Sequence, residues 1–312
     1  MFYKKLAVIK PIVTIAICTF NRDFYLEKCL NSLIKYGVDS KPIEVMVINN
    51  NSTDNTTIIV ERFQSEYKNI SYYNEKKVGL SHARNKALAK AKCDIIAFLD
   101  DDVKISDTYL DRLLWVIDNY SFDCLGGGYL PWYLNEKPKW IPEDFGRKEN
   151  LLDSIGVLKE DYVTGLNMIF TKQILNRIGG FPVKLGMIGN NIGYGEDDYV
   201  QFQIRKLGGV ILFDPELYVY HAVLEQKQHL SWQLVSIFIN AQSNFIIHRK
   251  DEGFFTLSFY FLKSLAAGII KRVPFGLYRF IFTNDFFYQN YIIFVLRPIL
   301  ITLGRLKVHF TK

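Results

Sequence analysis

Acidic and polar side chains stand at the ends of apolar, strand-like runs in this chain of 312 residues. Asp100–Asp102 follows the run Ile95–Leu99 directly, and Asn49–Ser52 follows the run that ends at Ile48. A third cluster, Glu196–Asp198, opens a helix-like stretch. Ligands of open α/β folds bind outside the carboxyl ends of the strands. Because adjacent carboxylates repel one another, a cation is their natural guest, and we expect a metal, a phosphorylated ligand and an enzyme.

These clusters suggest particular chemical roles, each with a structural alternative. Mg²⁺ or Mn²⁺ would take one or two carboxylates of Asp100–Asp102 and complete its shell with phosphate and water, although aspartates also favour turns. Asp197 is a candidate general base, but an acid also stabilises the start of a helix through the helix dipole. His221 ends a strand-like segment and could ligate the metal or serve the structure alone. Arg84 could contact phosphate near a helix start or lie on a solvated helix face.

The elements that must position these residues alternate between strand and helix. Apolar runs rich in β-branched residues at 12–18, 43–48, 70–73 and 95–99 are separated by stretches with helical spacing. This alternation predicts a mostly parallel central sheet with helices on both faces. From Gly126 the glycines, prolines and tryptophans predict a loose region, followed by strands near 162–170, 210–213 and 217–220 and by helices at 171–178 and 197–207.

Charge and composition separate a body from a tail. The net charge is +6, but residues 226–312 hold eleven Lys or Arg and three Asp or Glu, which gives +8 there and −2 elsewhere. The four cysteines form no CxxC pair, which indicates reduced thiols in a cytoplasmic protein. We see no cleavable signal peptide. A basic, aromatic tail suggests contact with an anionic membrane surface.

The tail contains two apolar stretches, 254–270 and 291–304. The first is slightly short for a membrane span, and Arg297 and Pro298 interrupt the second. Positive charges recur along the whole tail, so helices lying in the interface on the inner face of the cell membrane fit better than a spanning hairpin. A helical subdomain packed on the catalytic domain, or a dimer interface, is the alternative.

The motifs together resemble the family 2 glycosyltransferases of GT-A fold, of the bacterial polysaccharide-biosynthesis type. Each motif alone is weak, but all of them occur in order over about residues 10–225. They are Cys18–Arg22, Val47–Asp54, Gly79–Asn85, Phe98–Asp102, Thr164–Asn167, Gly179–Phe181, Gly195–Asp197 and Tyr218–His221. The resemblance implies a GT-A domain over residues 1–225, with a nucleotide half at about 10–125 and an acceptor half at about 126–225. The helical, membrane-associating tail is then 226–312.

The resemblance also implies roles for single residues. Those on the nucleotide side are Thr19, Asn21, Arg22, Asn50, Arg84, Asp100 and Asp101. Asp102 would ligate Mg²⁺ or Mn²⁺, with His221 at the same diphosphate–metal centre. Asp197 would be the catalytic base, and Glu196, Trp140 and Asn167 would lie toward the acceptor. Three positions depart from the usual pattern, namely Asn49, Lys77 and Tyr199, and the last makes Asp198 a second candidate for the base.

The function implied is inverting transfer of a sugar from a nucleotide donor, UDP-linked by default, to a glycan or lipid-linked glycan. A metal-dependent nucleotidyltransferase is an alternative, but the turn Thr19–Arg22 lacks the glycines of a phosphate loop. A non-catalytic, membrane-associated nucleotide-sugar-binding protein is another. Nucleic acid is not an expected partner, because the aromatic residues of the tail lie in apolar runs rather than between basic residues.

Overall fold

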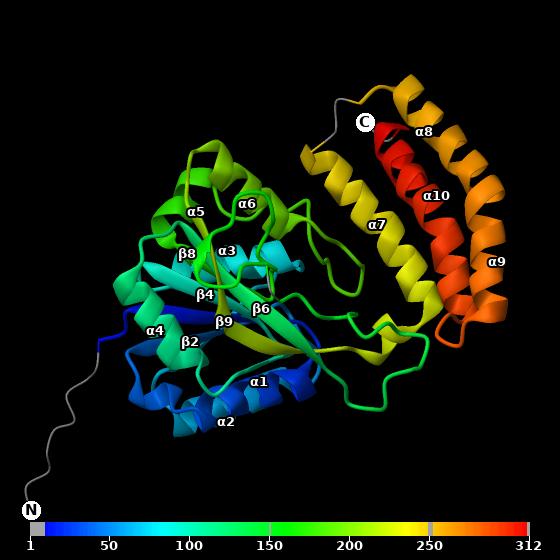
Figure 1. Cartoon of the computed structure of the whole chain (residues 1–312). Coiled ribbons are helices and arrows are strands. Elements are labelled where there is room, and N and C mark those ends of the chain that lie inside the picture. Colours follow the sequence, from blue (N-terminus) through cyan, green and yellow to red (C-terminus); the bar gives the residue numbers. More distant parts are fainter. Residues whose placement is uncertain (1–9, 150, 249–251, 311–312) are drawn as a thin grey trace, which may run out of the picture. The chain divides into compact units, whose positions relative to one another are not determined.

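The computed structural model describes residues 10–149, 151–248 and 252–310, and these form two compact units (Figure 1). Unit 1 comprises residues 10–131, Gly146–Lys184 and Glu196–His221. Unit 2 comprises Trp132–Phe145, Leu185–Gly195 and residues 222–310. The predicted tail boundary at residue 225 lies near the start of this last segment. Unit 2 additionally takes in two loops from the stretch that we assigned to the acceptor half.

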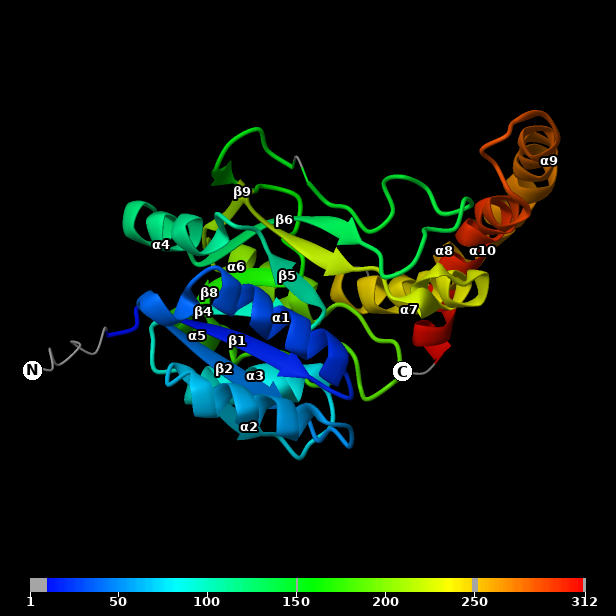
Figure 2. The ribbon, with the colours of Figure 1, turned by 90° about the horizontal axis from the view of Figure 1, so that it is seen from below.

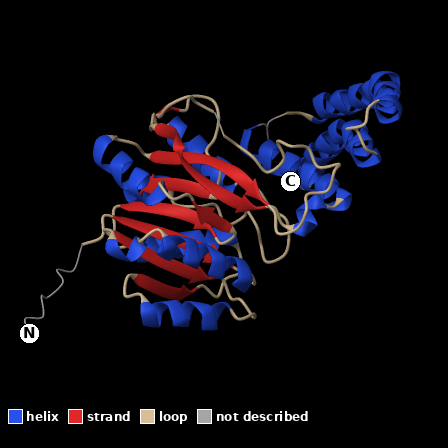
Figure 3. Cartoon of the chain, turned by 60° about the horizontal axis from the view of Figure 1, so that its bottom comes forward, coloured by secondary structure: helices blue, strands red, loops and turns tan. Residues whose placement is uncertain are grey.

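Unit 1 is built on a nine-stranded sheet in the order β3-β2-β1-β4-β8-β6-β9-β5, with β7 paired to β9 (Figure 3). The strands are β1 (Val13–Thr19), β2 (Ile43–Asn49), β3 (Ile70–Asn74), β4 (Ile95–Asp100), β5 (Val103–Ile105), β6 (Cys124–Trp132), β7 (Gly156–Val157), β8 (Asn167–Thr171) and β9 (Ile211–Ala222). β1 to β4 pair in parallel, as predicted. β8 pairs antiparallel with β4 and with β6, and β9 does so with β5 and β7. The sheet is therefore mixed, with parallel pairing among β1 to β4 and antiparallel pairing of β8 and β9 with their neighbours.

Helices cover both faces of this sheet, and alternate residues of β1 show why. Val13, Ile15 and Ile17 belong to one buried cluster, together with apolar residues of α1, α2 and α4. Ala16 and Cys18 belong to a second cluster, together with residues of α3, α5 and α6. Side chains of a strand point alternately to its two faces, so an apolar strand needs cover on both. The helices are α1 (Asp23–Lys35), α2 (Thr56–Glu66), α3 (Leu80–Lys90), α4 (Tyr109–Asn119), α5 (Lys172–Ile178) and α6 (Glu196–Lys206), with a short 3₁₀ turn η1 (Val38–Ser40) (Figure 2).

β6 takes the first residues of the region that we predicted to be loose from Gly126 onward, whereas residues 133–147 form no helix or strand, as predicted. The glycines of β6 have a packing reason. A Cβ atom on Gly127 would lie 1.6 Å from the carbonyl oxygen of Leu217, and one on Gly126 would lie 2.4 Å from the Val163 Cβ. Neighbouring backbone passes too close for a side chain, so glycine is required within the strand. Two further differences are β5, which we missed because it is three residues long, and β9, which runs unbroken through Pro215.

Unit 2 is helical apart from its loops. Its helices are η2 (Glu225–Gln228), α7 (Leu230–His248), α8 (Phe254–Ala267), η3 (Gly268–Arg272), α9 (Val273–Phe282) and α10 (Tyr288–Phe310). α10 packs against both α7 and α8. The π-helical turn η3 joins α8 to α9, so Phe254–Phe282 is one apolar helix of 29 residues. By length and composition this helix could cross a membrane. The apolar stretch 254–270 that we identified in the sequence is only part of it and is slightly short for a span.

The two loops of unit 2 are anchored to its helices. The Asn290 side chain of α10 donates a hydrogen bond of 2.8 Å to the Trp140 carbonyl oxygen. The hydroxyl groups of Tyr194 and Ser236 lie 2.8 Å apart, which ties the second loop to α7. Gly195 has φ +94°, and a Cβ there would lie 2.8 Å from Ile247 Cδ1 of α7. Only glycine combines this backbone conformation with so close a helix.

Candidate functional site

The parallel part of the sheet brings the predicted nucleotide-side residues to one edge. At the carboxyl ends of the strands, Thr19 lies opposite Asn49, and Cys18 lies opposite Asp100. The antiparallel strand β8 begins at this same edge, where Asn167 lies opposite Leu99. Strand register alone therefore assembles residues that lie far apart in the sequence, as expected for a ligand site in an open α/β sheet.

Arg22 closes the acidic turn that follows β4. Its Nη1 atom donates to Asp101 Oδ1 at 3.1 Å and to Asp102 Oδ2 at 2.9 Å. The two carboxylates are almost fully buried, while the Arg22 side chain remains 28% exposed. Asp101 and Asp102 thus share one cation that is still reachable from solvent. These charges, Asp101 first, raise the pKa of Arg22.

His221 reaches this turn through strand pairing. β5 begins one residue after Asp102 and pairs with β9, which places His221 opposite Val103. His221 Nε2 lies 3.4 Å from Asp102 Oδ1, on the oxygen that Arg22 does not contact. The two predicted metal-site residues are therefore neighbours. In the described part of the chain, no three His, Cys, Asp or Glu side chains are grouped so as to hold a metal ion by themselves.

Arg84 connects the two acidic clusters. From the buried face of α3, its Nη1 donates to Glu196 Oε1 at 2.7 Å and its Nη2 to Asp100 Oδ1 at 3.3 Å. Nη2 also donates to the Gly165 carbonyl oxygen at 3.1 Å, and the guanidinium lies 5.4 Å from the Phe181 ring centroid. With a side chain only 2% exposed, Arg84 holds β4, the 164–167 turn and the start of α6 together.

Asp197 is held by the turn before β8. The backbone N–H of Gly165 donates to its Oδ2 at 2.8 Å, and the N–H of Asp198 donates to its Oδ1 at 3.0 Å. A Cβ on residue 165 would lie 2.6 Å from that same Oδ2, so glycine is needed for this contact. Sequence reasoning did not assign Gly165 a role, although the motif Thr164–Asn167 contained it.

Asn21 and Asn50 use their side chains to shape loops at the sheet edge. Asn50 donates to the carbonyl oxygens of Glu75 and Lys77 and accepts from the N–H of Gly79 at 2.7 Å. Asn21, at φ 52°, accepts from the N–H of Thr53 at 2.7 Å. Both residues therefore position the backbone of the loops at this edge. Their direct contact with a nucleotide stays a prediction.

The residues predicted toward the acceptor lie in different places. Glu196 is buried against Arg84, as described above. Asn167 is fully buried, accepts from the Tyr109 hydroxyl at 2.8 Å and donates to the Leu217 carbonyl oxygen at 2.8 Å. These interior contacts give Asn167 a supporting position, and its predicted place toward the acceptor stays a prediction. Trp140 is half-buried in the first loop of unit 2.

Several carboxyl groups of the site hold protons more tightly than usual. Burial, reinforced by Asp102 and Asp100, raises the pKa of Asp101 to about 7 against the opposing charge of Arg22. Burial and the Asp197 charge raise the pKa of Glu196 and of Asp198 to about 7 as well. Burial is the main cause of these shifts. Asp100–Asp102 outnumber the two arginines that contact them, Arg22 and Arg84, which favours a further cation at this turn.

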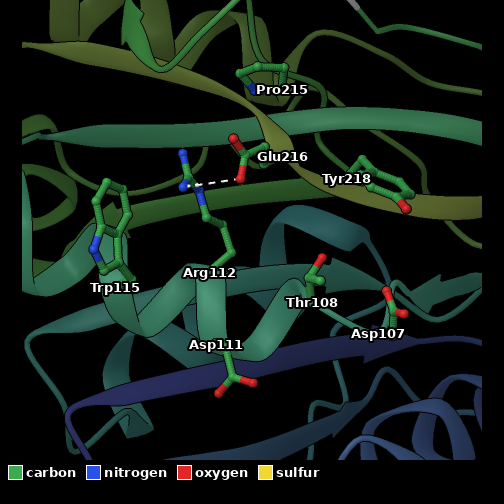
Figure 4. A pocket seen from close by; sticks show the side chains of 8 residues that line it. All are labelled: Asp107, Thr108, Asp111, Arg112, Trp115, Pro215, Glu216 and Tyr218. Carbon is green, nitrogen blue, oxygen red and sulfur yellow. Dashed lines mark ion pairs between the residues drawn. The ribbon is translucent and has the colours of Figure 1, made fainter.

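A shallow pocket of about 450 Å³ lies elsewhere in unit 1, between α4 and the Pro215–Tyr218 part of β9 (Figure 4). None of the residues predicted for catalysis, nucleotide or metal lines it. It is therefore a feature separate from the carboxylate edge.

The fold is that of the GT-A glycosyltransferases. A mannosyltransferase from Pyrobaculum calidifontis, solved with GDP-Man and Mn²⁺, superimposes with a TM-score of 0.64 at 16% identity, covering 98% of this chain and 89% of that one. The family model for glycosyl transferase family 2 matches residues 14–179. The chain belongs to this family.

Curated relatives agree with this assignment. The succinoglycan biosynthesis protein ExoM of Rhizobium meliloti is 26% identical over 235 residues, which are 74% of each chain. The GalNAc(5)-diNAcBac-PP-undecaprenol beta-1,3-glucosyltransferase of Campylobacter jejuni is 31% identical over 106 residues, 33% of this chain and 34% of that one. The matched regions thus span from about a third to three quarters of these relatives.

Gly165→Ala should lower kcat at least about 10-fold, because the added methyl group displaces the Asp197 carboxylate by a fraction of an ångström. Donor binding, measured by calorimetry, should change less than kcat, because the added Cβ would lie 3.3 Å from Arg84 Nη2, the nitrogen that contacts Asp100, but only 2.6 Å from Asp197 Oδ2. Gly156→Ala is the matched control, because its Cβ would meet only ordinary contacts. Wild-type kcat in Gly165→Ala would contradict the positioning of Asp197 by this turn.

Asp198→Asn should flatten the pH dependence of stability. The folded protein holds the Asp198 proton up to about pH 7, while the unfolded chain releases it near pH 4. The free energy of unfolding therefore falls as pH rises between these values. At pH 8 the variant should be more stable than the wild type, by on the order of 1 kcal/mol, with little difference at pH 4.

Urea denaturation at the two pH values measures this effect. Asp118→Asn, at an exposed position of α4, is the control. An Asp198→Asn curve parallel to that of the wild type across the whole range would contradict the raised pKa.

Proposed function

We propose that this protein transfers a sugar, with inversion, from a nucleotide-sugar donor to a hydroxyl group of a glycan or lipid-linked glycan. One observation carries the proposal: the Arg84 guanidinium binds Asp100 with one nitrogen and Glu196 with the other. This ties the edge assigned to the nucleotide to the helix that begins with Glu196 and Asp197. A single-displacement reaction requires a general base held close to the donor, and a carboxylate in this position can serve as that base.

In the proposed reaction Asp197 is the general base. Its carboxylate, oriented by the N–H groups of Gly165 and Asp198, takes the proton of the acceptor hydroxyl as that oxygen attacks the anomeric carbon. The bond between the anomeric carbon and the diphosphate oxygen breaks from the opposite face, so the configuration inverts. Glu196 and Arg84 hold the base in place, and Thr19, Asn21, Asn50 and Asp100 border the nucleotide.

We propose Mg²⁺ or Mn²⁺ as the cofactor, held by Asp102 and His221. The donor set fits, because one carboxylate and one imidazole leave room for diphosphate oxygens and water. When bound, the ion would neutralise the negative charge that develops on the leaving diphosphate. The Pyrobaculum mannosyltransferase was solved with Mn²⁺, which supports a divalent ion here. Arg22, in contact with Asp102 and partly exposed, would turn toward the phosphates.

UDP is the donor nucleotide that the resemblance favours. A nucleotidyltransferase remains the second candidate by class, and its product would be pyrophosphate rather than a nucleoside diphosphate. The residues after β1 argue against it, since Thr19–Arg22 contain no glycine to cradle a triphosphate. The acceptor proposal draws on the Campylobacter relative, whose name describes an undecaprenol-linked substrate.

Unit 2 would bring the enzyme to the cytoplasmic face of the membrane. Large apolar side chains of the helix Phe254–Phe282 are exposed, among them Phe259 at 63% and Ile270 at 71%. Lys271 and Arg272 follow at once, near the middle of the helix, where charge is costly inside a bilayer. A helix lying in the interface accommodates both features, with its apolar side in the lipid and its basic residues near anionic head groups.

Asp197→Asn should reduce kcat about 1,000-fold while leaving donor affinity nearly unchanged, because the amide keeps the shape but accepts no proton. Asp102→Ala should instead abolish the Mn²⁺-dependent part of UDP binding. A calorimetric titration with UDP and Mn²⁺ and an assay for released nucleoside diphosphate measure the two effects.

Asp198→Asn tests the second candidate for the base, and Asp118→Asn, at an exposed position of α4, is the control for both substitutions. Full activity in Asp197→Asn would remove this residue as the base. Release of pyrophosphate would favour the nucleotidyltransferase.

Ile270→Glu should weaken binding to vesicles that contain phosphatidylglycerol by about 100-fold. The substitution removes apolar burial of about 2 kcal/mol and adds repulsion of about 1 kcal/mol at an anionic surface. Ile58→Glu, at an equally exposed position of α2, is the control. Co-sedimentation measures binding, and equal binding by both variants would contradict the proposed surface. Wild-type protein that resists extraction by high salt and alkaline carbonate would indicate a spanning helix instead.

A further inference from the structure

The shallow pocket of unit 1 combines an exposed aromatic ring with carboxylates. Trp115 is 43% exposed, and Tyr218 lines the pocket from β9. Figure 4 shows Arg112 between Trp115 and Glu216, with Asp107 just before α4 and Asp111 on α4 pointing away from these three side chains. The indole therefore remains available to a ligand within this pocket, and an aromatic surface beside a few polar groups is typical of small-ligand sites.

Ion pairs make this aromatic surface rigid. Arg112 donates to fully buried Asp214 through Nε at 2.6 Å and through Nη2 at 3.2 Å, and its Nη1 lies 3.2 Å from Glu216. The guanidinium carbon lies 4.4 Å from the centroid of the Trp115 ring. Tyr120 contacts the same indole, with ring centroids 5.6 Å apart. The ring is thus preorganised, which lowers the entropy that a ligand would lose on binding.

The charges of the pocket decide the class of ligand. Arg112 is engaged by two carboxylates, so the pocket offers no uncompensated positive charge to an anion. Asp111 is paired with Lys41 and Glu216 with Arg112, so these carboxylates do not gather around a cation. What is left is a rigid aromatic surface bordered by hydrogen-bond acceptors and the Thr108 hydroxyl. That combination suits a neutral molecule with an apolar ring face and many hydroxyl groups, which describes a sugar.

We propose that this pocket binds a neutral oligosaccharide segment of the glycan substrate or product, apart from the transfer site. Tyr218 lies three residues from His221 along β9, a separation of roughly 10 Å at the rise of a strand, and faces the opposite side of the sheet. The proposal rests on the proposed glycosyltransferase function and adds a second contact with the glycan.

Binding is tested with hexasaccharides of glucose, N-acetylglucosamine and mannose on the full chain, by calorimetry and by tryptophan fluorescence. At least one should bind with Kd of about 1 mM, which corresponds to roughly −4 kcal/mol. Trp115→Ala should weaken that binding at least about fivefold, and Glu216→Gln should weaken it in the same direction. Phe24→Ala, at a similarly exposed aromatic position of α1, should bind as the wild type does.

Two outcomes would overturn the proposal: no binding by any of the three up to about 10 mM, or binding that Trp115→Ala leaves unchanged. Donor binding separates this failure from failure of the proposed function. Trp115→Ala should keep the full UDP and Mn²⁺ thermal shift, because none of the donor-side residues lines the pocket. A wild-type protein without that shift would instead remove the transferase proposal itself.

Discussion

One buried guanidinium organises unit 1. Arg84 is surrounded by Asp100, Glu196 and the Gly165 carbonyl oxygen, and its burial makes each of these partners necessary. Removing one member of such a buried group leaves an uncompensated charge at a cost of about 3–5 kcal/mol. Three segments that are distant in sequence therefore keep a single relative arrangement. The donor edge and the base belong to one electrostatic unit rather than to two adjoining sites.

Much of this arrangement could be predicted from the sequence. Fully apolar strands followed by polar residues indicate a parallel sheet whose carboxyl ends converge, and the register of β1, β2 and β4 confirms it. The neighbourhood of Asp102 and His221 was predicted only through the family resemblance. The physical cause is the pairing of β5 with β9. Because β5 has only three residues, its sequence gives no recognisable strand pattern, and this pairing could not be predicted.

Other features depended on tertiary contacts that local patterns do not carry. Glycines 126–128 look like loop residues, yet the backbone of β9 and the side chain of Val163 require them within a strand. Asn167 looks like a polar site residue, yet Tyr109 and Leu217 hold it in the interior. The anchoring of Trp140 by Asn290 joins residues 150 positions apart, and no short-range pattern predicts such a contact.

The packing of Gly195 under α7 constrains how this architecture can diverge. A Cβ on Gly195, the residue before Glu196, would collide with Ile247 and crowd Ser243 of α7, and the other loop is hydrogen-bonded to α10. The helices after residue 222 are therefore part of the scaffold around those loops and not a detachable anchor. A chimera that exchanges these helices between related enzymes must also exchange the loops at residues 132–145 and 185–195. Substitutions in the loops and in the helices should therefore be inherited together.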